Sequence, residues 1–184
     1  MKALSGRPKK CKECGKLFVP VRVFQVWCSS DCAVKLAKKI RAKEKKNEIK
    51  QRREAIKTRS EWLRDAQTAF NAWVRERDHD KPCISCGRHH KGQYHAGHYR
   101  SVAACPALRF NPLNTNKQCR PCNEMLSGNI IKYRMRLIKK IGLNLVEWLE
   151  QDHQPNKYTI EEIKEIKRKY SRMARELKKQ RESA

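Results

Sequence analysis

Long apolar segments are absent from this chain of 184 residues. No run approaches the ~20 apolar residues that a helix needs to span a bilayer, so we do not expect a membrane-embedded protein. Residues 1–8 also lack the apolar core of a secretory signal peptide. We therefore expect a protein that is not exported and that works in the cytoplasm.

Acidic residues are scarce as well. The chain has 19 Asp and Glu residues against 44 Lys and Arg residues, which gives a formal net charge of +25 and a pI near 10.0. This excess disfavours a small-molecule enzyme and favours a polyanionic partner, because a domain pI above about 9 is typical of nucleic-acid binding. DNA or RNA is therefore the expected partner.

Cysteine, in contrast, is plentiful. In a chain without export signals, nine cysteines indicate metal ligands rather than disulfides. Eight of them form four close pairs, and four thiolates suit the tetrahedral geometry of zinc. We predict two structural Zn²⁺ sites, one at Cys11, Cys14, Cys28 and Cys32 and one at Cys83, Cys86, Cys119 and Cys122. The ninth, Cys105, is interpreted as a small buried hydrophobe.

The first cysteine set defines a zinc module at residues 1–34. Gly15 suits the tight turn after the first pair, and residues 16–20 and 23–27 are predicted to be the strands of a hairpin. So small a unit needs its metal to fold. A basic helical linker is predicted at residues 35–57. Its apolar content is too low for a buried face, so we expect a solvated helix, with phosphate contact as the open alternative.

A central domain is expected at residues 58–158. Thr58 begins a capping box, and the helix that follows carries apolar residues at spacings of three and four, which we expect to pack on the second zinc unit. These residues are Trp62, Ala66, Ala69, Phe70, Trp73 and Val74. After the last cysteine, a long helix is predicted from Met125 to a glycine cap at Gly142.

A basic C-terminal helix is expected at residues 159–184, where Thr159 begins a second capping box. Its apolar residues again recur at spacings of three and four. They are Ile163, Ile166, Tyr170, Met173 and Leu177. This stripe fits docking onto the same domain or a short coiled-coil seam between two copies. We favour docking and keep a homodimer along this seam as the alternative.

The two central cysteine pairs are separated by 32 residues, more than the roughly 12–20 of a compact zinc ribbon. Hydrolysis of a phosphodiester needs a base and a hard cation. A neutral histidine is a suitable base near pH 7, and Mg²⁺ prefers oxygen ligands. We therefore predict that His98, in this insert, is the base. Asn123, beside the zinc ligand Cys122, is predicted to bind a catalytic Mg²⁺ or Mn²⁺ ion.

This pattern is similar to that of the HNH, or His-Me finger, nucleases over roughly residues 83–130. In that family a His ends the first strand, an Asn precedes the second cysteine pair, and a His or Asn follows it. His98, Asn114 and Asn123 occupy these places. The middle residue holds the loop backbone in the family, and Asn111 and Asn116 compete with Asn114 for that role.

The resemblance implies an α+β, mainly helical fold. It has an N-terminal zinc ribbon or knuckle, a central HNH ββα-metal core stapled by a four-cysteine zinc site, and long flanking helices. The whole chain resembles the NinG, or Rap, recombination endonucleases of lambdoid phages, through residues 69–73, 82–87, 96–100 and 122–123. That similarity implies a DNA endonuclease that cleaves D-loops or Holliday junctions in the cytoplasm of a bacterial host, with other recombination proteins as further partners.

One position departs from the HNH pattern. Many members place a metal-binding Asp directly before the base, where this chain has Gly97. Residues two apart on a strand share a face, so His95 is expected to supply the missing ligand; the alternative is contact with phosphate or solvent. The predicted DNA contacts are Arg100, Lys117 and Arg120, of which Arg100 has the planar fork that binds two phosphate oxygens.

The main alternative function is a non-catalytic zinc-ribbon protein that binds DNA or RNA. Paired zinc modules and high positive charge fit it equally well, but it leaves the order of His98, Asn114 and Asn123 unexplained. A recombination accessory that binds junctions without cutting them is a third interpretation. The remaining histidines of the insert, His89 and His90, are expected in an exposed loop.

Overall fold

A computed structural model describes residues 7–183 of the chain. Residues 1–6, which belong to the predicted zinc module and to the segment predicted not to be a signal peptide, lie outside the described residues, as does residue 184. The chain divides into two compact units, Met1–Lys57 and Thr58–Ala184, which are described separately. No helix in the described part is long and apolar enough to cross a membrane.

The N-terminal unit begins with a hairpin of two very short strands. β1 (Lys9–Lys10) pairs antiparallel with β2 (Leu17–Phe18). The predicted pairing of residues 16–20 with 23–27 is therefore wrong. The Gln25 side chain instead accepts hydrogen bonds from the backbone N–H groups of Val21 and Arg22 and donates one to the Trp27 carbonyl. These bonds hold residues 21–27 in a turn in place of a strand.

A single exposed helix completes this unit. α1 (Ser30–Ala55) is capped by Ser29, whose hydroxyl accepts the N–H of Cys32, and it has Asp31 in its first turn and basic residues in its last. These features suit the helix dipole. None of its described residues is buried, so the predicted solvated helix is confirmed. It starts five residues earlier than expected, which places Cys32 in its first turn.

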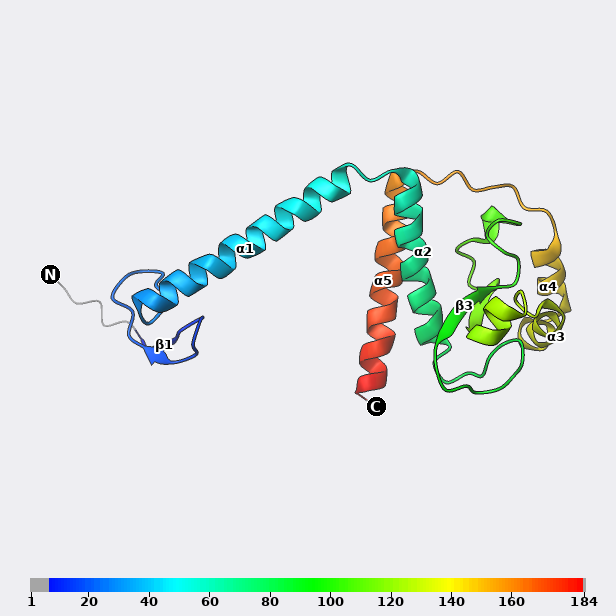
Figure 1. The fold of residues 1–184 in the computed structure, drawn as a ribbon, viewed down its shortest axis with the longest axis horizontal. Coiled ribbons are helices and arrows are strands. Elements are labelled where there is room, and N and C mark those ends of the chain that lie inside the picture. The colour runs from blue at the N-terminus through cyan, green and yellow to red at the C-terminus, as the bar shows by residue number, and fades with distance from the viewer. Residues whose placement is uncertain (1–6, 184) are drawn as a thin grey trace. The chain divides into compact units, whose positions relative to one another are not determined.

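Two long helices form the frame of the second unit. α2 (Arg59–Arg77) and α5 (Ile160–Glu182) both begin with the predicted capping boxes, at Thr58 and Thr159. The two helices lie side by side (Figure 1). The apolar stripe predicted for α2 is buried in full and packs mainly against α5. The expected packing of α2 on the zinc unit is a secondary contact, which includes the ring contact of Phe70 with His98 and a hydrogen bond from Arg77 to the Thr115 carbonyl.

The apolar stripe of α5 packs against α2 of the same chain. Ile163 and Tyr170 are buried against α2, and Ile166, Met173 and Leu177 pack around them. The predicted docking is thus confirmed. Because α2 covers this stripe, it offers no free surface for a coiled-coil seam with a second copy.

The second unit also contains an antiparallel hairpin of two five-residue strands. β3 (Tyr94–His98) pairs with β4 (Thr115–Cys119), with Tyr94 opposite Cys119 and His98 opposite Thr115. The connecting loop includes the short 3₁₀ helix η1 (Pro106–Leu108). Every residue of β4 is buried although four of the five are polar. Their hydrogen bonds to side chains and backbone explain how such a strand tolerates burial.

The segment after β4 is broken where one long helix was predicted. A π-helical turn, η2 (Pro121–Met125), is followed by three residues with positive φ, Ser127, Gly128 and Asn129. Because a right-handed helix needs negative φ, α3 begins only at Ile130 and runs to Ile141. Its predicted cap at Gly142 is confirmed, with φ +88°.

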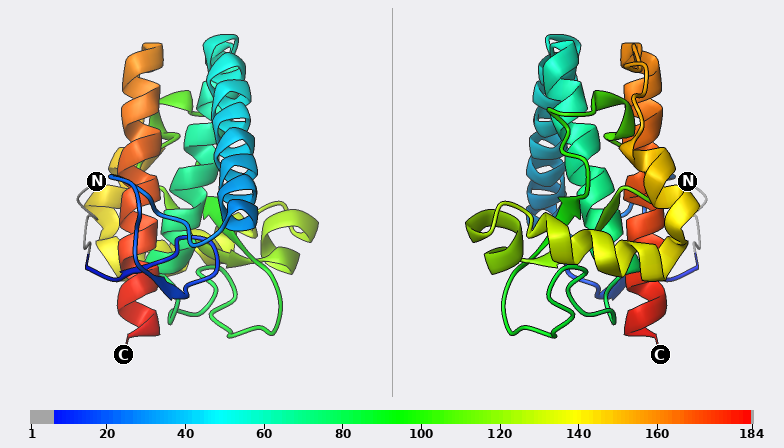
Figure 2. Two further views of the ribbon diagram at one scale, coloured as in Figure 1. Left: turned by 90° about the vertical axis from the view of Figure 1, so that its left-hand side faces the viewer. Right: turned by 90° about the vertical axis from the view of Figure 1, so that its right-hand side faces the viewer.

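A second apolar cluster lies under α3 and the short helix α4 (Leu143–Glu150). Figure 2 shows α3 lying across the direction of α2 and α5. Tyr133 and Leu137 of α3 pack here with Val146 and Leu149 of α4. Cys105 joins this cluster at 4% exposure, which confirms its interpretation as a buried hydrophobe.

Candidate active site

Both predicted cysteine sets converge. In each set the four Sγ atoms all lie within 4.8 Å of one another, and no cysteine in the described part forms a disulfide. The sulfur separations include 3.5 Å between Cys14 and Cys28 and 3.9 Å between Cys86 and Cys119. Four thiolates at 2.3 Å from a tetrahedral Zn²⁺ are separated by roughly 3.8 Å. Both clusters therefore fit a zinc ion.

The first Cys-x-x-Cys pair of each cluster forms the same backbone turn. The N–H of Gly15 donates to the Cys11 carbonyl at 2.9 Å, and the N–H of Gly87 donates to the Cys83 carbonyl at 2.8 Å. Both glycines have φ near +70°, at +74° and +70°. This left-handed conformation costs glycine little, so the Cys-x-x-Cys-Gly sequence produces the turn locally.

The second cluster ties together the elements around the insert. Cys83 and Cys86 lie in the loop after α2, Cys119 ends β4 and Cys122 lies in η2. Two side chains contact its sulfurs: Asn129 Nδ2 donates to Cys122 Sγ at 3.5 Å, and His90 Nε2 lies 3.1 Å from Cys86 Sγ. The expectation of an exposed His90 is therefore wrong, because its ring packs beside the cysteine cluster. His89 is exposed as expected.

His98 and Asn123 face one cavity of about 530 Å³. His98 is the last residue of β3, and Asn123 lies in η2 directly after a cysteine of the cluster. Arg100 lines the same cavity. The hairpin and the cysteine cluster thus bring together three polar residues that are up to 25 positions apart in the sequence.

The surroundings of His98 favour its neutral form. Burial lowers its pKa below the ordinary value of 6.5, against the opposing effect of a hydrogen bond to the Arg109 carbonyl. That bond joins His98 Nε2 to the Arg109 oxygen at 3.1 Å. Because a carbonyl oxygen only accepts, Nε2 carries the hydrogen and Nδ1 keeps the lone pair of a base.

Asn114 holds the backbone of the loop that follows His98 through hydrogen bonds. It is fully buried; its Oδ1 accepts the N–H of Arg100 at 2.8 Å, and its Nδ2 donates to the carbonyls of Arg100 and Leu108 at 3.0 and 3.3 Å. Its two competitors have other duties. Asn111 accepts the N–H of Leu113 in a local turn, and Asn116 faces a separate network with Arg77 and Lys140.

His95 contacts Asn123 but does not line the cavity. Its Nδ1 lies 3.4 Å from Asn123 Nδ2 and 3.5 Å from a carboxylate oxygen of Glu124. Its Nε2 is buried without a hydrogen-bond partner among the described residues. Glu124 was missed by the sequence analysis, although its position directly after Asn123 was a usable signal for an acidic group near the site.

Steric contact explains why glycine occupies position 97. A Cβ at this position would lie 2.0 Å from Oε1 of Gln118, whose side chain fills the space. Gln118 is itself held by hydrogen bonds from its Nε2 to Ser85 Oγ and to the Gly128 carbonyl. An Asp before the base is therefore incompatible with this Gln118 conformation.

The side chains of the three residues predicted to contact DNA differ in exposure and in their hydrogen bonds. Arg120 is exposed and pairs with Glu124 at 2.7 Å, and Arg100 donates to the Glu150 carbonyl at the end of α4. Lys117 is only 6% exposed, and its amine donates to the His79 carbonyl at 2.6 Å. The geometry favours a structural role for Lys117 over the predicted substrate contact.

Comparison with known proteins places these features in a family. Residues 5–182 match the family described as NinG, Bacteriophage Lambda NinG protein. The chain is 42% identical to Protein ninG of Escherichia phage lambda and 41% identical to Protein ninG of Salmonella phage P22. The first alignment covers 96% of both chains; the second covers 96% of this chain and 97% of the relative. No solved structure matches. The chain belongs to the NinG family of bacteriophage proteins.

Proposed function

We propose that the protein is a metal-dependent DNA endonuclease of the HNH, or His-Me finger, type. The observation that carries this proposal is the shared cavity of His98 and Asn123. His98 ends the first strand of the hairpin and Asn123 follows the last cysteine, as the HNH resemblance implies. The antiparallel hairpin followed by helical segments has the element order of a ββα core, and it supports the assignment.

His98 acts as the general base. Its Nδ1 accepts a proton from a water molecule whose oxygen attacks the phosphorus, and the bond from phosphorus to the 3′-oxygen breaks. The products are a 5′-phosphate and a 3′-hydroxyl, the latter protonated by solvent. The lowered pKa of His98 favours the neutral ring at pH 7, so activity should rise with pH through a midpoint that lies below the ordinary value of 6.5.

Asn123 and His95 are the residues that would hold a divalent cation. When bound, Mg²⁺ or Mn²⁺ would offset the charge that develops on the phosphate and the leaving oxygen. The amide oxygen of Asn123 is a hard ligand of the kind Mg²⁺ prefers, and the buried Nε2 of His95 has no protein partner in residues 7–183. Glu124 Oε1 lies 3.5 Å from His95 Nδ1 and adds negative charge nearby.

Asn114 and the cysteine cluster position these groups. Asn114 fixes the backbone of Arg100, two residues after the base, through hydrogen bonds in both directions. A zinc ion at the second cluster would fix Cys122 and thereby limit the motion of Asn123. Rigid support of this kind is what a catalytic constellation needs, since displacements of about 1 Å cost activity.

The substrate we propose is branched DNA of recombination, such as D-loops and Holliday junctions. The NinG resemblance is the reason for this choice, and the positive charge supplies the attraction to DNA. α1 is a basic helix with no buried residue, and its surface suits phosphate contacts. A two-fold-symmetric junction suits a homodimer. Its interface must lie outside the α5 stripe, and light scattering of the full chain tests the oligomeric state.

The decisive experiment compares His98→Ala with His89→Ala, an exposed histidine outside the cavity. Both proteins are assayed with and without Mg²⁺ on labelled linear duplex, flap, D-loop and four-way junction DNA. His98→Ala should lose about 10²–10⁴-fold in cleavage rate while DNA binding and zinc content persist. His89→Ala should cleave like the wild type. Wild-type protein that binds but cleaves none of these substrates with any divalent ion would favour the non-catalytic alternatives.

A further inference from the structure

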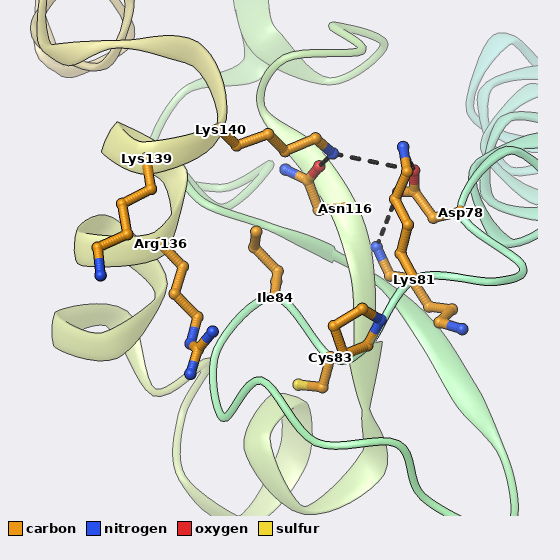
Figure 3. Close-up of a pocket in the computed structure, with 10 residues that line it drawn as sticks. Asp78, Lys81, Cys83, Ile84, Asn116, Arg136, Lys139 and Lys140 are labelled. Carbon is orange, nitrogen blue, oxygen red and sulfur yellow. Dashed lines mark hydrogen bonds and ion pairs between the residues drawn. The ribbon is translucent and has the colours of Figure 1, made fainter.

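A second cavity, of about 260 Å³, lies away from His98 and Asn123. It is formed by the loop after α2, by β4 and by the C-terminal half of α3 (Figure 3). Five of the ten residues that line it are cationic. They are Lys81, Lys117, Arg136, Lys139 and Lys140. Asp78 is the sole acidic residue among these ten.

The carboxylate of Asp78 does not make this cavity repel anions. It accepts two hydrogen bonds from Arg77, at 2.6 and 3.1 Å, and one from Lys81 at 3.0 Å. The backbone N–H of Lys117 donates to it at 3.2 Å, and Lys140 Nζ lies 3.8 Å away. One negative charge is thus shared by several cations, and the surroundings keep an excess of positive charge.

Two cations on α3 have donors to spare. Lys139 forms no hydrogen bond or ion pair with any residue between 7 and 183. Arg136 makes one long hydrogen bond, 3.4 Å, to the Cys86 carbonyl, and its guanidinium lies over Gly87, where a Cβ would be 2.1 Å away. A guanidinium has five N–H donors, so most of its capacity is unused. The aliphatic side chain of Ile84 lies between these cations and Asp78 (Figure 3).

We propose that this cavity binds one phosphate group of a nucleic-acid backbone. The fork-shaped guanidinium of Arg136 and the ammonium group of Lys139, beside a small recess, suit a tetrahedral anion. α3 runs from Ile130, at the candidate active site, to Arg136, at the second cavity. At 1.5 Å per residue these positions are roughly 9 Å apart along the helix axis, so a single DNA strand can reach both cavities.

The cavity would therefore anchor the DNA strand a few nucleotides from the phosphate that faces His98. This assignment rests on DNA as the partner in the proposed function, but not on cleavage. Binding measured without divalent cations tests it separately, because those conditions do not require turnover.

The test compares Lys139→Gln with Lys132→Gln. Both lysines are exposed on α3, but only Lys139 lines the cavity. Affinity for a fluorescently labelled DNA duplex is measured against salt concentration, with zinc content and circular dichroism as checks of folding. Lys139→Gln should lower the log–log salt slope by about 0.9, the value for one phosphate contact, and Lys132→Gln should leave it unchanged.

A second variant separates the recess from charge alone. Ile84→Phe fills the cavity and keeps every cation, so it should weaken binding if a phosphate enters and leave binding unchanged if the lysines act only through their field. Lys139→Gln with wild-type affinity and slope would overturn the proposal. Inorganic phosphate provides a second check, by NMR of α3 at constant ionic strength. If phosphate perturbs these signals but both lysine variants bind DNA equally well, the cavity takes free phosphate and not the DNA backbone, and the proposal is overturned.

Discussion

The two cysteine clusters have the same Cys-x-x-Cys-Gly turn but differ in their surroundings. In the N-terminal unit Cys14 is exposed, and α1, which begins at the cluster, buries no residue. In the second unit three of the four cysteines are buried, and the same unit contains two apolar clusters. The same ligand chemistry thus occurs once with almost no core and once beside an extensive one.

This difference implies that a bound metal would serve the two units differently. A unit with little apolar burial would depend on zinc for its folding free energy. In a unit with its own core, zinc would instead hold particular residues in position, and here that residue would be Asn123, next to Cys122. The comparison predicts that loss of zinc unfolds the first unit completely and leaves the second folded. In the second unit, zinc, the polar network and packing should each contribute separately to the free energy of unfolding.

Zinc removal should have the largest effect. Wild-type protein should contain two zinc ions by elemental analysis. Cys11→Ser should abolish hydrogen-exchange protection in the N-terminal unit and leave the second unit protected, since structural zinc contributes about 10–16 kcal/mol in small domains. Cys83→Ser should unfold the hairpin and η2 around the second cluster.

Cys105→Ser is the control for the zinc measurements, because this buried cysteine is outside both clusters. It should leave the zinc content at two. One zinc per wild-type chain, or a disulfide within either cluster, would contradict the assignment and remove the basis of the comparison.

The polar network of the second unit should show the next largest effect. Asp78 is 1% exposed and joins α2 to β4 and α3 through Arg77, Lys117 and Lys140. Asp78→Asn removes the buried carboxylate that pairs with the partly buried Arg77 and Lys140, and it should cost up to about 3–5 kcal/mol in urea unfolding. Asp80→Asn is the matched control, because its side chain is 94% exposed and its loss should cost under about 0.5 kcal/mol.

The same carboxylate gives a pH dependence of known sign. Burial raises the pKa of Asp78, but the hydrogen bond and charge of Arg77, with Lys140 and Lys81, lower it overall to about 2 from 3.8. Because the folded pKa lies below the unfolded one, this contribution is fully present above about pH 4 and is lost as the pH falls toward 2. Asp78→Asn should remove that part of the acid sensitivity; equal acid sensitivity in both proteins would place it elsewhere.

Packing at Gly97 should show the smallest of these effects. Gly97→Ala places a Cβ against Gln118 and should cost about 1–3 kcal/mol, with a matching loss of cleavage because His98 is the next residue. The Gln118→Ala background removes the obstacle, so the same substitution should cost less there. Additive effects in this double-mutant cycle would refute the steric explanation.

Local patterns in the sequence predicted much of this protein correctly. The eight cysteines, both capping boxes, the buried stripe of α2 and the cap at Gly142 were all predicted. Each depends on residues a few positions apart, whose spacing decides whether they meet. For the site, the HNH resemblance predicted that His98 and Asn123 belong together, and they line one cavity; Asn114 holds the loop as that resemblance implied.

Other features were decided only by the tertiary structure. The strand partner of Leu17, the break before α3 and the pairing of α2 with α5 depend on contacts or turns that no periodicity encodes. The burial of β4 is the clearest case. Its sequence, Thr-Asn-Lys-Gln-Cys, is that of a surface strand. Partners distant in the chain, such as Asp78 and Tyr133, supply hydrogen bonds that let it enter the core, and the sequence pattern does not reveal them.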